Sequence, residues 1–264
     1  MDATERYFSA LENEWPERNV GRLRFYLEYL FDWVPLAGRR VLDIGAGDGV
    51  YSFYAAAAGA ERVVALEPEA AGSSPGVTGR FSHLSDVLGL DSVELRGETF
   101  QEFDPNGERF DVLFMHAAIN PLDEPATMAL DSDEGARQTY RSLFSKLASM
   151  GAPGAKLVAS DAARSNLFTR LPVKNPLQPT IEWEKHQAPE TWVSLLEDAG
   201  FGDARVRWNS LNALRRPGRV VLGNRLAAWL LDSAFCLTMT LQREPAARAA
   251  TGPPGAQRLG PPDR

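Results

Sequence analysis

The sequence predicts an α/β protein whose sheet is mainly parallel and covered by helices on both faces. Short apolar runs typical of strands alternate with amphipathic segments typical of helices, and turns rich in glycine or proline separate them. Such alternation implies βαβ units. The chain has 264 residues, of which 44% are hydrophobic, so it can build one large domain or two small ones.

Two helices, at residues 4–13 and 19–33, are expected before the sheet. The first strand is the buried apolar run 40–44, and the helix after it ends at Gly59, a residue typical of helix termini. The next elements are predicted in order as helix 50–58, strand 62–66, helix 79–88, strand 92–96 and strand 110–115.

The clearest helix covers residues 132–150, where Tyr140, Leu143, Phe144 and Leu147 form an apolar stripe before Gly151. The remaining elements are predicted as strand 155–160, helix 189–199, strand 203–208 and strand 234–243. We therefore expect N-terminal helices in 1–38, one domain over 39–243 with insertions at about 162–188 and 210–232, and a disordered Pro- and Gly-rich tail at 244–264.

Bulk properties exclude several function classes. The net charge is −7 and no basic stripe is present, which argues against a nucleic-acid partner. Cys236 is the only cysteine, so an internal disulfide is excluded and a reducing compartment is expected. The N-terminal segment has no apolar signal core and no long apolar span occurs, so we expect a cytoplasmic protein.

The segment "VLDIGAGDG" joins a strand to a helix through closely spaced glycines, an arrangement that binds nucleotides. A dinucleotide such as NAD and S-adenosylmethionine both suit it. The third glycine, Gly49, comes one position too early for the dinucleotide pattern, and Asp43 and Asp48 disfavour a diphosphate. Asp43 is expected to face the cationic methionine end of S-adenosylmethionine, and Glu67, after the second strand, to accept the ribose hydroxyls.

The segments "VLDIGAGDG", "VVALEPE", "RGETFQEF", "FDVLFMHA" and "GAKLVASD" resemble successive motifs of class I S-adenosylmethionine-dependent methyltransferases. The resemblance implies a Rossmann-like seven-stranded sheet, mainly parallel, with the last strand antiparallel. It also implies S-adenosylmethionine as the cofactor and a set of cofactor-binding residues: Gly45, Ala46, Gly47, Glu67, Pro68, Glu98, Thr99, Phe100 and His116. Core packing is the competing interpretation of Phe100, and a solvated loop acid that of Glu98.

The acceptor is expected to be a small molecule, methylated at oxygen with the help of a general base. His116 and His186 are the candidate bases, because each follows a strand at its carboxyl end, and His83 is expected at the surface. Glu182, Trp183 and Glu184 are candidates for orienting His186 or binding the acceptor. Methylation of an amine, a non-catalytic regulator that binds S-adenosylmethionine, and an NAD-dependent oxidoreductase remain alternatives.

Three further features have ordinary structural interpretations. Asn120 and Pro121 in "INPLD" give half of an amino-methyltransferase motif several residues too late, so we expect a turn there. Asp123 and Asp161 lack the companions of a catechol enzyme's metal site, so a metal-free reaction is favoured. The apolar and arginine-rich stretch 215–232 is expected to pack on the core or form a homodimer; a lid or a membrane contact is the alternative.

Overall fold

A single mixed sheet runs through the molecule in the computed structural model, which describes residues 2–69, 75–171, 173–209 and 214–242. The tail predicted at 244–264 lies outside these ranges. The strand order is β3-β2-β1-β4-β5-β7-β6. The strands are β1 (Arg40–Ile44), β2 (Arg62–Leu66), β3 (Val93–Arg96), β4 (Phe110–His116), β5 (Gly151–Ala162), β6 (Phe201–Trp208) and β7 (Ala234–Leu241).

The first five strands pair in parallel, whereas β7 is antiparallel to both β5 and β6. The predicted fold class is therefore confirmed. Because β5 and β6 run in the same direction, the carboxyl ends of every strand except β7 lie at one edge of the sheet. This edge is where an open α/β sheet binds its ligands.

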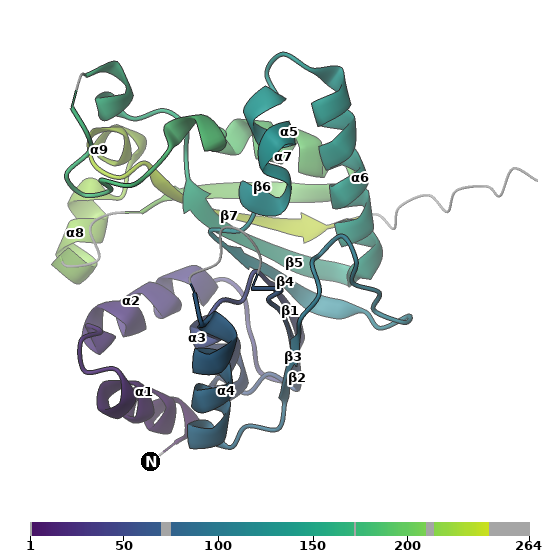
Figure 1. Cartoon of the computed structure of the whole chain (residues 1–264), viewed down its shortest axis with the longest axis vertical. Helices are drawn as coiled ribbons and strands as arrows, with labels where there is room; N and C mark the ends of the chain where they lie inside the picture. The colour runs from purple at the N-terminus through teal and green to yellow at the C-terminus, as the bar shows by residue number, and fades with distance from the viewer. Residues whose placement is uncertain (1, 70–74, 172, 210–213, 243–264) are drawn as a thin grey trace, which may run out of the picture.

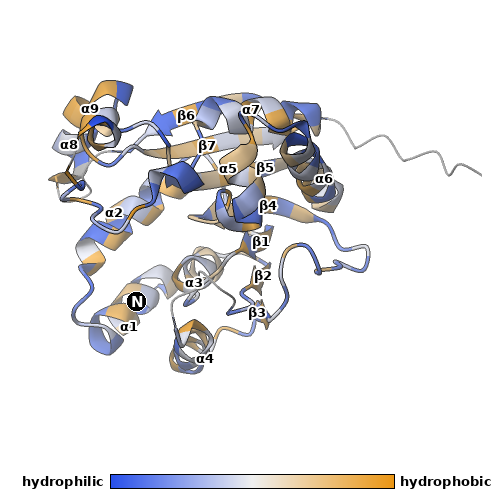
Figure 2. Cartoon of the chain, turned by 45° about the horizontal axis from the view of Figure 1, so that its top comes forward, coloured by the Kyte–Doolittle hydropathy of each residue, from blue (hydrophilic) through white to orange (hydrophobic). Residues whose placement is uncertain are grey.

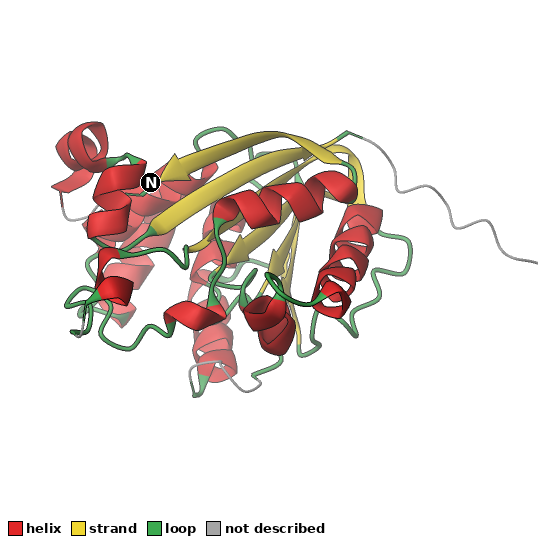
Figure 3. Cartoon of the chain, turned by 90° about the horizontal axis from the view of Figure 1, so that it is seen from above, coloured by secondary structure: helices red, strands yellow, loops and turns green. Residues whose placement is uncertain are grey.

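Helices cover both faces of the sheet (Figures 1 and 3). One face carries α1 (Ala3–Glu14), α2 (Val20–Phe31), α3 (Val50–Ala57) and α4 (Val77–Leu88), and the other carries α5 (Glu124–Ala129), α6 (Glu134–Met150) and α7 (Pro189–Asp198). Each layer has its own apolar core. Phe53 and Phe114 belong to the first core, and Phe144 and Trp192 to the second, all fully or almost fully buried.

The second predicted insertion contains two short helices, α8 (Arg215–Leu222) and α9 (Arg225–Leu230). Figure 2 shows them beside each other at one corner of the molecule, with apolar stretches on both. No helix in the described ranges is long and apolar enough to cross a membrane.

The turn predicted at 119–123 is a 3-10 turn, Pro121–Asp123, which leads directly into α5. The sequence analysis did not predict α5. The Asp123 carboxylate accepts a hydrogen bond of 2.9 Å from the Ala126 amide, and Pro125 occupies the first helical turn, two signals that start a helix. Strand β5 also begins four residues earlier than predicted, at Gly151 directly after α6.

Candidate active site

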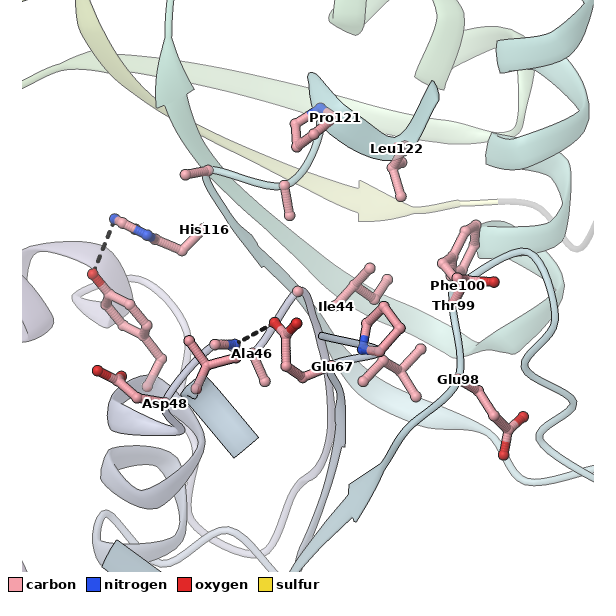
Figure 4. Close-up of a pocket in the computed structure, with 18 of the residues that line it drawn as sticks. Ile44, Ala46, Asp48, Glu67, Glu98, Thr99, Phe100, His116, Pro121 and Leu122 are labelled. Carbon is pink, nitrogen blue, oxygen red and sulfur yellow. Dashed lines mark hydrogen bonds between the residues drawn. The ribbon is translucent and has the colours of Figure 1, made fainter. Parts of the chain in front are cut away.

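The glycine turn between β1 and α3 borders a cavity of about 570 Å³, here called the cofactor cavity. Its wall contains every predicted cofactor-binding residue except Asp43. The predicted residues in the wall are Gly45, Ala46, Gly47, Glu67, Pro68, Glu98, Thr99, Phe100 and His116. Figure 4 shows that Asp48 and His116 border one end of this cavity and that Glu98, Thr99 and Phe100 border the other.

Two of the glycines are required by the backbone. Gly45 and Gly47 have φ values of +75° and +57°, in the left-handed region that favours glycine. A Cβ on Gly45 would also lie only 2.9 Å from the Cβ of Ala118, whereas a Cβ on Gly47 would meet nothing within 4 Å. The turn therefore approaches the segment after β4 closely and leaves open space above Gly47.

Glu67 directly follows β2 and is 4% exposed, with its carboxylate at the wall of the cofactor cavity. Its Oε2 accepts a hydrogen bond of 2.9 Å from the Gly47 amide, and its Oε1 accepts one of 3.0 Å from the Glu69 amide. Both amides fix the carboxylate, and the bond from Gly47 links the turn after β1 to the end of β2 (Figure 4).

Asp43 does not line the cofactor cavity, contrary to the expected contact with the methionine end of the cofactor. It lies beneath the glycine turn, 1% exposed, where its Oδ2 accepts a hydrogen bond of 2.6 Å from the Ser52 hydroxyl. Its Oδ1 is buried and has no hydrogen-bond partner among the described residues. Burial raises the pKa of Asp43 to about 7, the Ser52 hydroxyl lowers it, and the charge of Glu67 raises it further. The carboxylate that reaches this end of the cavity is Asp48, which pairs with Arg18.

Charge in the wall of the cofactor cavity favours a cationic ligand. Asp48, Glu67 and Glu98 line it, and Arg80 is the one cationic residue among its described lining residues. A diphosphate would face three carboxylates at close range, whereas a sulfonium and an ammonium group would be attracted. The cavity thus suits S-adenosylmethionine better than NAD.

Phe100 combines both interpretations that the sequence left open. It lines the cofactor cavity and is also 3% exposed, as a member of the apolar core beneath α6.

The Thr99 hydroxyl is 2.7 Å from a carboxylate oxygen of Glu102, to which it donates, so it fixes the turn after β3.

His116 ends β4 in a hydrogen-bonded chain. The Ser160 hydroxyl donates to the carbonyl of Phe235 (3.1 Å), so Tyr26 donates to Ser160 (2.8 Å) and accepts from Nε2 of His116 (3.1 Å). Tyr51 stacks on the imidazole at 4.3 Å and its hydroxyl lies 3.0 Å from the same Nε2. Burial lowers the pKa of His116 to about 4. The ring is therefore neutral near pH 7, and its proton is on Nε2.

A second cavity of about 500 Å³, here called the acceptor cavity, adjoins the first. His116 and Ala117 line both cavities. The remaining wall comes from α2, the ends of β5 and β7, and the first insertion: Tyr26, Ser160, Asp161, Ala162, Leu177, Gln178, Pro179, Thr180, Ile181, His186 and Ala234. Gln178 Oε1 is buried without a hydrogen-bond partner among the described residues.

His186 and Asp161 face each other in the acceptor cavity. Nε2 of His186 lies 3.9 Å from Oδ1 of Asp161, and Nδ1 is 2.9 Å from the carbonyl oxygen of Glu182. Since a carbonyl only accepts, Nδ1 carries a proton, and Nε2 of the neutral ring has a free lone pair. Burial raises the pKa of Asp161, and the charge of His186 and the Ala162 amide act in the opposite direction.

Glu182, Trp183 and Glu184 do not line the acceptor cavity, so the structure does not bring them to the predicted acceptor contact. Glu182 forms an ion pair of 2.6 Å with Lys185, and its side chain and that of Glu184 are exposed. The part of the insertion that forms the wall is the preceding stretch 177–181. Glu182 does orient His186, but through its backbone carbonyl. As expected, His83 is at the surface, 2.6 Å from Glu14.

The sequence analysis assigned Asn120 only to a turn and did not predict its hydrogen bonds beside the acceptor cavity. It is 2% exposed, its Oδ1 accepts from the Gln187 amide (3.0 Å), and its Nδ2 donates to the Ala162 carbonyl (3.4 Å). Its own carbonyl accepts from the Thr127 hydroxyl (2.6 Å). Asn120 thus joins the end of β5 to the residue after His186. An asparagine beside a proline is also the ordinary signature of a turn, so no local signal marks this role.

Comparison with known proteins supports the resemblance. No family model matches the sequence. The chain is 27% identical over 221 residues to a ubiquinone biosynthesis O-methyltransferase of Hahella chejuensis, an alignment that covers 81% of this chain and 83% of that protein.

Solved S-adenosylmethionine-dependent methyltransferases share the architecture. The structure from Mesorhizobium loti matches with a TM-score of 0.55 at 16% identity, covering 81% of this chain and 95% of that one. The structure from Aquifex aeolicus matches with a TM-score of 0.53 at 19% identity, covering 81% and 88%. The predicted enzyme class and cofactor agree with these relatives, and the chain has the class I S-adenosylmethionine-dependent methyltransferase fold that its motifs indicate.

Proposed function

We propose that this protein transfers the methyl group of S-adenosylmethionine to an oxygen atom of a small organic acceptor. The observation that carries the proposal is the junction of the two cavities at His116 and Ala117, with the His186–Asp161 pair in the second cavity. Methyl transfer is an in-line displacement, so it needs donor and acceptor in adjoining sites. The Hahella relative, named as an O-methyltransferase, agrees with an oxygen acceptor.

The cofactor would be held by the wall of the first cavity. Glu67 would accept hydrogen bonds from the ribose hydroxyls, and the backbone of Gly45 to Gly47 would contact the methionine part. Glu98, Thr99 and Phe100 would flank the adenine at the other end. When bound, S-adenosylmethionine supplies a methyl group activated by its positively charged sulfur.

His186 would act as the general base. Its Nδ1 is fixed by the Glu182 carbonyl, so Nε2 is free to take the proton of an acceptor hydroxyl as the oxygen–carbon bond forms and the sulfur–carbon bond breaks. The new N–H bond leaves an imidazolium 3.9 Å from the Asp161 carboxylate, which stabilises it. S-adenosylmethionine would supply the methyl group to the acceptor oxygen and leave as the neutral thioether, while the proton of the hydroxyl would be held on His186.

His116, the second candidate base from the sequence, is less suited to this role. With a pKa lowered to about 4 by burial, it binds a proton poorly near pH 7. Its Nε2 is also committed to the two tyrosines. We assign it to the wall that separates and aligns the two ligands.

The proposal is tested with S-adenosylmethionine carrying a radioactive methyl group and matched phenols and anilines with the same ring substituents. Label in a phenol ether, lost in His186→Ala, would support O-methylation by this base. Label in the aniline alone would favour an N-methyltransferase. Calorimetric binding of S-adenosylmethionine with no labelled product from any acceptor would favour the non-catalytic alternative.

A further inference from the structure

A third cavity, of about 340 Å³ and here called the apolar cavity, lies at the same edge of the sheet. Ala163, just after β5, and Trp208, at the end of β6, form part of its wall. Leu226 and Trp229, on α9, form another part, and Pro189 begins α7 beside them. The proposed reaction uses none of these residues.

The three cavities follow the strand order. The cofactor cavity lies at the ends of β1, β2 and β4, the acceptor cavity at the ends of β4, β5 and β7, and the apolar cavity at the ends of β5 and β6. Successive residues divide the last two: Ala162 lines the acceptor cavity and Ala163 the apolar cavity. Ala162 ends β5 and Ala163 follows it directly, so the two walls meet at the end of this strand.

The wall of this cavity is chemically suited to hydrocarbon. Two tryptophans and a leucine dominate it, and its charged residues, Glu190 and Arg225, neutralise each other in an ion pair of 2.9 Å. Arg225 also lies 5.7 Å from the centre of the Trp208 ring. A charged substituent would therefore find no unpaired partner there, whereas an apolar one would leave water.

Exposed apolar side chains are concentrated around the same edge. Of the eleven large hydrophobic residues found exposed in the described ranges, eight belong to the two insertions. They are Leu171, Val173, Leu177, Leu214, Val220, Val221, Leu226 and Leu230. Leu177 lines the acceptor cavity and Leu226 the apolar cavity. The two insertions also touch, since the Asn175 side chain donates a hydrogen bond of 2.5 Å to the Leu231 carbonyl.

We propose that the apolar cavity binds a hydrocarbon substituent of the methyl acceptor, carried on the side away from the methylated oxygen. This inference rests on the proposed function, because it makes the acceptor an amphiphile whose hydroxyl end lies at His186 and whose chain lies between Trp208 and Trp229.

Two probes test it without turnover: 4-methylphenol and 4-heptylphenol, titrated by calorimetry into protein saturated with S-adenosylhomocysteine. Burial of a methylene contributes about 0.8 kcal/mol, so the heptyl compound should bind at least about tenfold tighter even if only two methylenes are buried. Leu226→Ser and Trp229→Leu should each reduce that preference about threefold or more and leave 4-methylphenol unchanged. Leu226 is 66% exposed, so its replacement should not disturb folding.

Val220→Ser is the matched control, because Val220 is 86% exposed on α8 and lines none of the three cavities. It should affect neither probe. Equal affinity of the two phenols for the wild type would overturn the inference. An equal loss of the preference for 4-heptylphenol in Val220→Ser and Leu226→Ser would also overturn it, because the heptyl chain would then bind on the outer surface of the helices. If 4-heptylphenol bound more tightly than 4-methylphenol but neither phenol were methylated, the apolar binding site would be supported and the proposed reaction contradicted.

Discussion

Nε2 of His186 lies 3.9 Å from Oδ1 of Asp161, too far for a hydrogen bond and near enough for strong attraction once the imidazole is protonated. The two groups come from different parts of the fold. Asp161 is the second-last residue of β5, whereas His186 follows a 3-10 turn of the insertion. Their separation leaves space at Nε2 for the hydroxyl of an acceptor.

Replacing His186 by alanine should lower kcat by about 10²–10⁴, the usual contribution of a general base. The affinity for S-adenosylhomocysteine should not change, because His186 does not line the cofactor cavity. Steady-state kinetics and calorimetry measure the two quantities. His83→Ala is the matched control, since this histidine is at the surface in an ion pair with Glu14. A fully active His186→Ala enzyme would transfer the proposed role to another group.

Asp161→Asn should separate activity from stability. Losing the carboxylate removes the partner of the imidazolium. The activation free energy of the reaction should therefore rise by about 1–3 kcal/mol, and kcat should fall accordingly. Burial raises the pKa of Asp161, which means that the folded state pays to keep it charged. The neutral variant should therefore unfold at the same or a higher temperature at pH 8, measured by calorimetry. A less stable variant with normal kcat would make Asp161 a structural residue only.

Glu67→Ala should weaken cofactor binding by about 1–3 kcal/mol, the cost of removing a hydrogen-bond partner in a buried site. The loss should be equal for S-adenosylmethionine and S-adenosylhomocysteine, because both carry the ribose and only the former carries the sulfonium. Calorimetry with the two ligands checks this. If the variant bound S-adenosylhomocysteine normally while losing S-adenosylmethionine, Glu67 would be recognising charge instead.

Asp43 and His116 should give the unfolding free energy opposite dependences on pH. Burial raises the pKa of Asp43 from 3.8 to about 7, so between these values the folded state holds a proton that the unfolded chain has lost, and stability falls as pH rises. Burial lowers the pKa of His116 from 6.5 to about 4, so there the unfolded chain holds the extra proton, and stability rises with pH. In the wild type the two effects largely cancel.

Single substitutions should reveal each slope, up to about 1.4 kcal/mol per pH unit. In cofactor-free Asp43→Asn, the unfolding free energy from urea titrations should rise with pH between about pH 4.5 and 6.5, more steeply than in the wild type. In His116→Gln it should decrease over the same window. Parallel curves for the wild type and both variants would show that neither group titrates differently in the folded protein.

The sheet and the cofactor cavity were predictable because their signals are local. The strand periodicity and the glycine turn lie in short stretches of sequence, and Glu67 follows its strand directly. The side-chain direction of Asp43 was not predictable, since it depends on Ser52 of α3 packing beneath the turn. The wall of the acceptor cavity combines Tyr26, Asp161 and the stretch 177–181, which only the folded chain brings together.

The hydrogen bond from Tyr26 to Ser160 spans 134 positions of the sequence and closes the cavity wall next to His116. Its consequence concerns protein engineering. A shortened chain that began at β1 would lose Tyr26 from the wall of the acceptor cavity and would expose the apolar core that α1 and α2 cover. Exchanging α2 between relatives is therefore a route to altered substrate selectivity, and deleting it is not a route to a minimal enzyme.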